Sequence, residues 1–233
     1  MIRLVVALAL VPLSAAAQTF GLPQGCTAYL TVQKRGCTVS HLFTCEGDPA
    51  GHQRRADLGE EGLLYVGVID AETQWIESWH VEADSTERLL PGAADPASFT
   101  ELSTLGRDTF EFTTLSDDIY ETIFRGQDEL TGETVVIDGV TLERTAFQVT
   151  AYDPAGNELW TTSGNEFISR DWRTFFSGTR TTANATETWD SDGTPMEFIF
   201  PGEDGFLASS PRHDCGVLMS MADLAALQPP EGN

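Results

Sequence analysis

The sequence predicts an all-β fold, an antiparallel meander of hairpins that forms a barrel, half-barrel or sandwich and carries one or two short helices. Turn-forming residues recur at intervals of about ten residues, which is typical of such folds. The segments between the turns are short and rich in Thr, Phe and Trp, which favour strands. No fixed-period repeat is found, and this argues against a propeller or a solenoid.

The first residues have the features of a signal peptide. Arg3 gives a short basic region, an apolar run follows over residues 4–13, and three alanines stand at 15–17. We therefore expect cleavage after the last of these alanines. The apolar run is about half of the ~20 residues that a membrane-spanning helix needs, so a membrane anchor is the less favoured interpretation.

These features divide the chain into a signal peptide at 1–17, a single β domain at 18–228 and a frayed tail at 229–233. No linker-like stretch divides the middle part, and no later segment has the length and hydropathy to span a bilayer. We expect a soluble bacterial protein that is located in the periplasm or secreted.

The chain is strongly acidic, with a formal net charge of −23 at pH 7. Such a surface repels nucleic acid and anionic lipid, so we expect no nucleic-acid partner. The acidic residues are spread along the chain, as on an ordinary solvated surface. Attraction of cations or of a basic partner is the alternative interpretation.

The first cysteines lie in a segment, 26–45, that predicts a β-hairpin around a two-residue turn at 35–36. An even number of cysteines in an exported protein predicts disulfides. Opposed residues of a hairpin have Cβ atoms ~4.5–5.5 Å apart, close to disulfide range. The hairpin places Cys26 opposite Cys45, and Cys37–Cys215 then follows by elimination.

The same two-residue turn places Val32 opposite Val39 and Leu30 opposite His41. Apolar partners then share one face of the hairpin, and mainly Thr, Ser and Gln side chains share the other. This division predicts a hairpin with one buried side.

A metal site is the alternative for this segment. Cys37, His41 and Cys45 are spaced by four, and His52 follows. Strand residues four apart lie ~13 Å from each other, which is too far for one tetrahedral ion unless the strand bends. We therefore favour disulfides and expect no metal ion and no cofactor.

A polar loop is expected over 46–62, followed by a second hairpin made of residues 63–70 and 73–81. Trp75 and Trp79 are expected on one side of its second strand. Residues 96–105 predict a short helix. Asp95 would cap it, Pro96 suits its first turn, and Gly106 would end it.

From residue 107 onward the pattern predicts further hairpins. Asp138-Gly139 is the strongest turn signal in the chain, and it places Glu133 opposite Arg144. The apolar side then shifts by one residue, which predicts a bulge near 144–146. Further turns are expected at 153–157, near 177–178 and at 191–193, and a last helical turn at 220–227.

Motifs of catalysis are absent from the sequence. There is no nucleophile elbow, no zinc-protease helix, no phosphate-binding loop and no dinucleotide fingerprint. His213 has Asp214 beside it, but neighbouring strand residues point to opposite faces. Asp190 and Asp192 resemble the start of a calcium loop whose later ligands are missing. We name no catalytic residue and consider an enzyme the less favoured class.

The aromatic residues are the most suggestive feature that remains. The sequence contains 5 Trp and 13 Phe, most of them in predicted strands. Core packing is the simplest explanation. The alternative is a lumen or cleft that holds an apolar or sugar-like ligand. The tryptophans that could line it are Trp75, Trp79, Trp160 and Trp172.

Three functional hypotheses follow from this sequence. The first is a non-catalytic periplasmic protein that binds a hydrophobic ligand or a component of the cell envelope. The second is a structural or protein-interaction module of the envelope. The third, and the least favoured, is a hydrolase in which a histidine meets a carboxylate and a hydroxyl.

Overall fold

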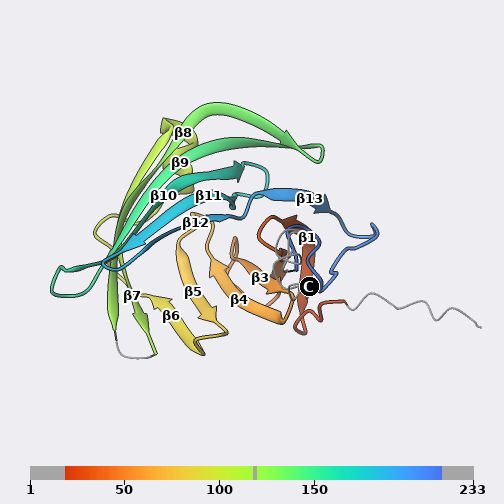
Figure 1. Cartoon of the computed structure of the whole chain (residues 1–233), viewed down its shortest axis with the longest axis horizontal. Helices are drawn as coiled ribbons and strands as arrows, with labels where there is room; N and C mark the ends of the chain where they lie inside the picture. The colour runs from red at the N-terminus through yellow and green to blue at the C-terminus, as the bar shows by residue number, and fades with distance from the viewer. Residues whose placement is uncertain (1–18, 118–119, 217–233) are drawn as a thin grey trace, which may run out of the picture.

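The computed structural model describes residues 19–117 and 120–216, and in it the chain forms one antiparallel sheet of 13 strands (Figure 1). The order is β12-β11-β10-β9-β8-β7-β6-β5-β4-β3-β2-β1-β13. This confirms the predicted all-β antiparallel class. The sheet is one curved surface with two edges, neither a closed barrel nor a pair of separate stacked sheets.

The strands follow one another along the sheet almost in chain order, as expected for a meander. Their bounds are β1 (Cys26–Lys34), β2 (Thr38–Cys45), β3 (Gln53–Gly59), β4 (Gly62–Ile69), β5 (Trp75–His80), β6 (Ser85–Leu89), β7 (Arg107–Ser116), β8 (Glu121–Ile137), β9 (Val140–Tyr152), β10 (Glu158–Ser169), β11 (Thr174–Asn184), β12 (Thr188–Asp192) and β13 (Pro195–Ile199). One helix, α1 (Phe99–Leu105), precedes β7.

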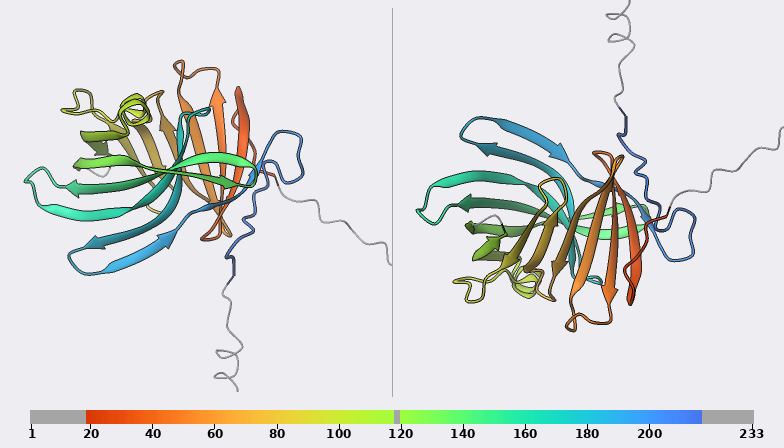
Figure 2. Two further views of the ribbon diagram at one scale, coloured as in Figure 1. Left: turned by 90° about the horizontal axis from the view of Figure 1, so that it is seen from above. Right: turned by 90° about the horizontal axis from the view of Figure 1, so that it is seen from below.

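The two edges of the sheet are joined by the chain itself. β12 pairs with β11, and β13, which follows at once, pairs with β1 at the far end of the strand order. Between them, the Gly193 amide donates to the Gly178 carbonyl of β11 at 3.0 Å, and Thr194 accepts from the Arg35 amide at 2.9 Å. The sheet therefore has to curve back on itself, as Figures 1 and 2 show.

The first hairpin pairs Cys26 with Cys45 as predicted, although its internal register differs. Its turn has three residues, because Lys34 pairs with Thr38. A bulge at Tyr29 absorbs the extra residue. The two differences cancel at the open end of the hairpin, where the cysteines meet.

Between the turn and the bulge, every predicted pair is shifted by one residue. The predicted pairs Val32–Val39 and Leu30–His41 are wrong, since His41 lies opposite Thr31. The expectation of one solvated face is also wrong. Strands β1 and β2 are buried on both faces along most of their length.

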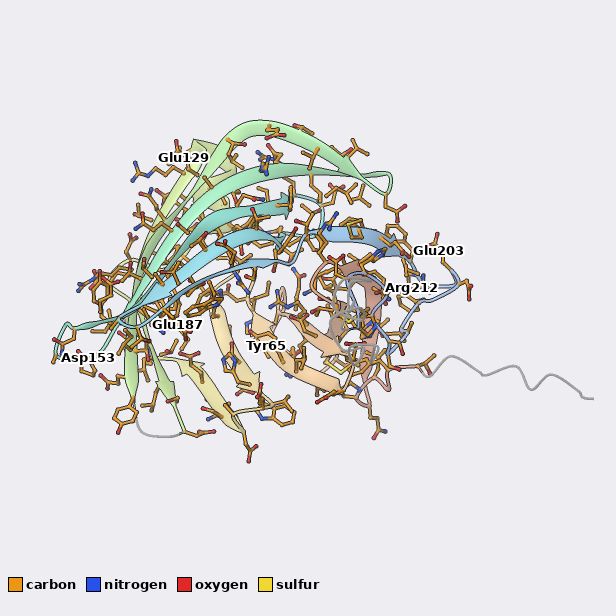
Figure 3. The ribbon with its side chains drawn as sticks, in the orientation of Figure 1. Tyr65, Glu129, Asp153, Glu187, Glu203 and Arg212 are labelled. Atoms are coloured by element: carbon orange, nitrogen blue, oxygen red, sulfur yellow. A yellow bond between two sulfur atoms is a disulfide. The ribbon has the colours of Figure 1, made fainter. Side chains whose placement is uncertain are left out.

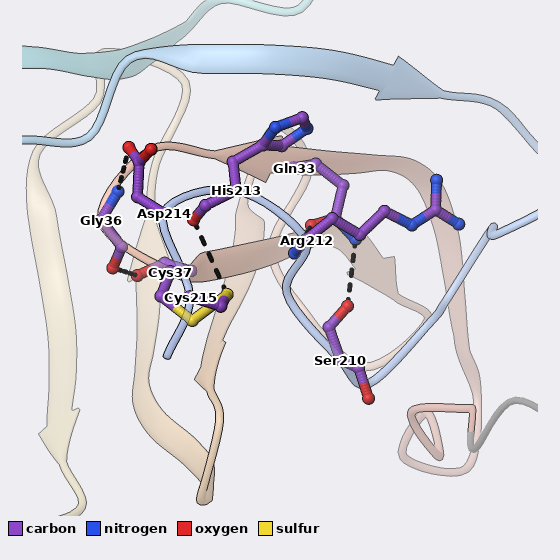
Figure 4. The surroundings of a disulfide bond; sticks show 9 residues. Gln33, Gly36, Cys37, Ser210, Arg212, His213, Asp214 and Cys215 are labelled. Carbon is purple, nitrogen blue, oxygen red and sulfur yellow. Dashed lines mark hydrogen bonds between the residues drawn. A yellow bond between two sulfur atoms is a disulfide. The ribbon is translucent and has the colours of Figure 1, made fainter. Parts of the chain in front are cut away.

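The segment after β13 covers the face that the sequence predicts to be solvated. The Leu207 amide donates to the Thr31 hydroxyl at 3.0 Å, and the Arg212 amide donates to the Gln33 side chain at 3.0 Å. The Cys37–Cys215 disulfide fastens this segment to the first hairpin (Figure 4). Both disulfides, Cys26–Cys45 and Cys37–Cys215, are the pairs that the strand argument predicts.

The prediction of a polar loop over 46–62 is wrong, because β3 lies within this segment. Charged residues made this strand look like a loop, but they have partners. Arg54 forms an ion pair with Asp48 at 2.7 Å, and Arg55 and Asp57 form a pair at 3.3 Å beside the interior cavity. Alternating charged and apolar residues here mark a strand whose charges are compensated.

Several other boundaries also differ from the prediction. Helix α1 begins at Phe99 with Ser98 as its N-cap, so Asp95 is not the cap, while Gly106 does end the helix with φ 83°. The prediction of a turn near 177–178 is wrong, because β11 continues through these residues with a bulge. Strand β6 was not predicted.

The Asp138-Gly139 hairpin is confirmed. Both residues have positive φ, as a type I′ turn requires. Glu133 and Arg144, which the turn places opposite each other, lie in a shift of the strand register and form an ion pair at 3.1 Å. The predicted bulge exists, but it lies on β8 between Leu130 and Thr134, opposite the expected place on β9.

The expected signal peptide at 1–17, the helical turn at 220–227 and the tail at 229–233 lie outside the described residues. Within the described residues, no helix combines the length and the hydropathy needed to cross a membrane.

The ends of the long strands pack against the first hairpin and form one apolar core. Its buried members are Leu30, Val32, Leu42, Leu142, Phe167, Phe176 and Phe198. They come from β1, β2, β9, β10, β11 and β13, so this core joins the beginning of the sheet to its later half. Burial of this apolar area is the main force that favours the curved form.

His41 is a buried histidine in the hairpin. Its ring is fully buried, it stacks on Phe20 with ring centroids 4.8 Å apart, and its Nδ1 lies 3.0 Å from the Thr31 hydroxyl. Its Nε2 is buried as well. Burial lowers the pKa of His41 from 6.5 to about 4. The ring is therefore a neutral core residue.

We predict that the long-range disulfide stabilises the fold more than the local one. Cys37 and Cys215 are 178 residues apart, whereas Cys26 and Cys45 are 19 apart. Loop-closure entropy then gives about 5 kcal/mol for the first bond and about 3 kcal/mol for the second. Urea denaturation of the two Cys→Ser double variants measures both. Equal or reversed losses of the free energy of unfolding would contradict this.

We predict that His41 makes the protein sensitive to acid. The unfolded imidazole gains a proton near pH 6.5 and the folded one only near pH 4, so stability falls as the pH falls through this window. The total is on the order of 3 kcal/mol, at about 1.4 kcal/mol per pKa unit. In urea denaturation at pH 7, 5.5 and 4.5, His41→Phe should show a flatter profile than wild type, and His52→Asn an unchanged one. Parallel profiles for His41→Phe and wild type would disprove this role.

Candidate functional site

The concave side of the sheet contains a cavity of about 690 Å³. Residues of β3–β11 line it, together with Thr73 and Ala97 from the connecting segments. This volume lies within the ~300–1,000 Å³ that is usual for small-molecule sites. The strand register orders the lining into rows that run across the strands.

The first row is aromatic. Phe112 of β7 lies opposite Phe124 of β8, and the next positions across β9 and β10 are Ala151 and Trp160. The ring centroids of Phe112 and Phe124 are 5.2 Å apart, and Trp160 is 5.9 Å from Phe124. Trp75 of β5 meets both phenylalanines edge-on at 5.4 Å. These rings form an apolar wall in the preferred geometries for aromatic pairs.

The second row depends on a glycine. Phe110 lies opposite Gly126, which is followed across the sheet by Val149 and Thr162. A Cβ atom at Gly126 would come within 2.5 Å of the Phe110 ring. The missing side chain therefore leaves room for the Phe110 ring beside β8.

The third row is polar and acidic. Asp108 lies directly opposite Asp128, followed across the sheet by Phe147, Gly164 and Arg180. This row is four residues from the aromatic row along β7, about 13 Å at ~3.3 Å per residue. The cavity wall thus changes from aromatic to charged over the length of a small amphiphilic molecule.

A fourth row continues the polar end. Thr145 of β9 stands between Leu130 of β8 and Glu166 of β10, with Ser177 of β11 beyond. Thr145 is fully buried, and its hydroxyl has no hydrogen-bond partner among the residues that the structure describes. Thr145 and Phe147 share a face of β9, so this hydroxyl lies on the same side as Asp128 and Glu166.

Two of these carboxyl groups resist ionisation. Burial, reinforced by Glu166 and Asp108, raises the pKa of Asp128 to about 8. Burial also raises the pKa of Glu166 to about 7, although Arg180 and Arg55 oppose the shift. Neither side chain accepts a hydrogen bond from any group in the described part of the chain. Both carboxyl groups are therefore available to a ligand.

Asp108 has a structural role as well. It accepts a hydrogen bond from the Ser98 amide at 2.9 Å, at the start of α1. Burial is the main reason that its pKa is raised, to about 6. At neutral pH it therefore places negative charge beside Asp128.

The opposite wall carries a compensated charge network centred on Asp57. Its carboxylate accepts from the Ser40 hydroxyl at 2.5 Å and lies 3.3 Å from Arg55 Nε and 3.5 Å from Lys34 Nζ. Burial opposes ionisation of Asp57, but Arg55 and Lys34 hold its pKa below the usual range. Arg55 also stacks over the Tyr65 ring at 5.1 Å, and Figure 3 shows Tyr65 inside the curve of the sheet.

The structure places only two of the four predicted tryptophans on the cavity. Trp75 and Trp160 line it, whereas Trp79 and Trp172 do not. Trp75 and Trp79 were expected on one side of β5. This is wrong because Ile76 forms a bulge, with Val68 paired to Glu77 and Ile69 to Trp75. The bulge turns the two tryptophans to opposite faces.

Trp172 belongs to the apolar core. Its ring lies 6.0 Å from Phe176 and 6.2 Å from Phe198, both members of that core. It lies in the turn between β10 and β11 and so packs at the ends of these strands.

The histidines give no triad among the described residues. His80 lines the cavity 3.8 Å from Glu87, but the Ser78 hydroxyl there bonds to Tyr65 at 2.9 Å. His213 lies 2.7 Å from Glu197, away from the residues that line the cavity.

The metal alternatives find no support in the described residues. Cys37 and Cys45 belong to two different disulfides, so neither sulfur is a thiolate ligand. Asp190 accepts from the Thr181 hydroxyl, and Asp192 caps the following turn at the Thr194 amide.

Sequence reasoning missed the polar lining. Asp128 and Glu166 each stand two residues after a glycine within a strand, Gly126 and Gly164. The sequence signal for these two residues was a glycine followed two positions later, on the same face of the strand, by an acidic residue. It was not recognised because glycine and acidic residues are both uncommon inside strands.

Comparisons with models of known protein families, with curated proteins and with solved structures find no match for this chain. The site therefore has to be interpreted from its geometry.

We predict that Asp128 destabilises the empty protein as the pH rises. The unfolded carboxyl loses its proton near pH 4 and the folded one only near pH 8, so stability falls across this window. Asp128→Asn removes the titration and should be more stable than wild type at pH 8, with a smaller difference at pH 5. Urea denaturation at pH 5, 6.5 and 8 measures it.

The matched control is Glu129→Gln. Glu129 is the next residue on β8 and is exposed, and Figure 3 shows it on the outside of the sheet. Its pH profile should follow wild type. An Asp128→Asn profile parallel to wild type would show that burial does not hold this carboxyl neutral.

Proposed function

We propose that this protein is a non-catalytic binding protein that holds a small molecule with an apolar body in the cavity of its curved sheet. The observation that carries the proposal is the aromatic row of Phe112, Phe124 and Trp160, closed by Trp75, on a cavity of about 690 Å³. Aromatic side chains with a few convergent polar groups are typical of small-molecule sites.

The surroundings of the cavity favour binding over catalysis. The histidine that reaches the cavity, His80, lies beside Glu87, and the hydroxyl of Ser78 is bonded elsewhere. General-base activation of a hydroxyl needs a direct hydrogen bond to the base. We therefore assign the polar groups to ligand recognition.

We further propose that the protein acts in the periplasm or outside the cell. The two disulfides support this location, since such bonds persist mainly in oxidising compartments. The apolar stretch and the alanines at the start of the chain are typical of an export signal. A carrier or sensor of small apolar molecules in the cell envelope is consistent with both features.

The experiment is a titration with N-phenyl-1-naphthylamine, an uncharged fluorophore that brightens in apolar surroundings. We expect saturable binding, and about 10-fold or more weaker binding to Trp75→Ala, because a lost aromatic contact costs about 1.5–3 kcal/mol. Trp79→Ala is the matched control, since it removes the same side chain from the same strand outside the cavity lining.

Two results would contradict the proposal. One is the absence of saturable binding to wild type. The other is equal weakening by Trp75→Ala and Trp79→Ala, which would place the fluorophore on the outer surface of the sheet.

A further inference from the structure

Among the described residues, Asp128 at the acidic end of the cavity has neither a basic partner nor a hydrogen-bond donor. Asp128 has two carboxyl groups as its charged neighbours, Asp108 directly opposite on β7 and Glu166 beyond β9. The intervening strand presents Thr145 and Phe147 there, and neither carries a charge. Like charges in opposed strand positions are unfavourable, so a cation placed here would relieve a cost already present in the fold.

The basic residues of the cavity are already engaged. Arg55 and Lys34 compensate Asp57 on the opposite wall. Arg180 donates to the Ser191 hydroxyl at 3.1 Å, and its charge acts on Glu166. An anionic ligand would have to compete with these carboxylates. A cationic ligand would meet Asp128, which has no cation of its own.

Two further features favour a positively charged group at this end of the cavity. The Thr145 hydroxyl, fully buried between the strands of Asp128 and Glu166, has no hydrogen-bond partner within the described part of the chain. Phe110 and Phe147 also line this part of the cavity. Aromatic faces attract ammonium groups by about 0.5–2 kcal/mol, most strongly where water is excluded.

We propose that the ligand is an amphiphilic amine whose ammonium group binds between Asp128 and Glu166, while its apolar body lies along the aromatic row. This inference rests on the proposed function and names the chemical class of its ligand. The distance of about 13 Å between the acidic and aromatic rows sets the length of the molecule. A single chain of about ten carbons, or a fused ring system of that length, spans it.

The test compares three competitors that share a decyl chain and differ in the head group. Decyltrimethylammonium, decanol and decanoate each displace N-phenyl-1-naphthylamine from the protein at pH 7.5 and 0.15 M salt. We expect decyltrimethylammonium to reach half-displacement at a concentration about 10-fold or more below decanol. Decanoate should compete no better than decanol.

Variants then test which carboxyl groups cause the preference for decyltrimethylammonium over decanol. Asp128→Asn and Glu166→Gln should each reduce the advantage of decyltrimethylammonium over decanol by about 5-fold or more, with decanol unchanged. Glu129→Gln is the control, since it replaces the neighbouring carboxyl group by an amide on the exposed side of β8. It should keep the full advantage.

The pH gives an independent readout, because a quaternary ammonium does not titrate. Its binding has to ionise Asp128, so its affinity should rise from pH 6 to pH 8 and level off above. The carboxyls facing Asp128 are Asp108 and Glu166, which ionise at lower pH and contribute below pH 7. Asp128→Asn should flatten the profile between pH 7 and 8.

The outcomes separate this inference from the proposed function. Equal loss in Asp128→Asn and Glu129→Gln would attribute the preference to the net charge of the chain and overturn the inference. Stronger competition by decanoate would overturn it too and place the head group at Arg55. In both cases the cavity still binds the fluorophore, and the proposed function stands. Absence of fluorophore binding to wild type would remove both.

Discussion

The passage of the chain from β12 to β13 is the constraint on which the rest of the structure depends. An open sheet of 13 strands would ordinarily have two distant edges. Here Gly193 and Thr194 take the chain from the last strand of one edge to a strand that pairs with β1. The sheet has to curve so that its ends meet, and one of its faces becomes an interior. The Cys37–Cys215 bond fastens the segment that follows β13 against the same hairpin.

The residues on that interior face decide whether it is filled or hollow. At one end, Leu30, Phe176 and Phe198 fill the space and form a core. At the other end, Gly126 lacks a side chain that would come within 2.5 Å of Phe110, and the strands carry the carboxyl groups of Asp128 and Glu166. Buried carboxyl groups without donors cost stability, and a protein keeps them where binding uses them. The Asp57 network shows the contrast, because there each charge has its partner within the chain.

The sequence predicted the class of fold, the strongest turn and both disulfide pairs, but not the register inside the strands. Local signals set the turn at Asp138-Gly139, because only certain residues adopt its backbone. Bulges are harder to place, since they depend on the partner strand: the bulge expected near 144–146 lies opposite, on β8. The bulge at Tyr29 offset an error in turn length and left the cysteine pair correct, whereas the bulge at Ile76 separated Trp75 from Trp79. Strand β3 was missed because its charged residues resemble those of a loop, although Arg54, Arg55 and Asp57 all form ion pairs in the folded chain.

The most direct test of this account is a crystal structure determined under xenon pressure, because xenon enters apolar cavities that are empty in the folded protein. The account predicts a xenon atom among the rings of Trp75, Phe112 and Phe124, with the Asp128 end of the cavity holding water instead. Rings that close on one another and leave no xenon site there would show that the curved sheet fills its own interior. That result would contradict the central claim that the fold encloses a binding cavity.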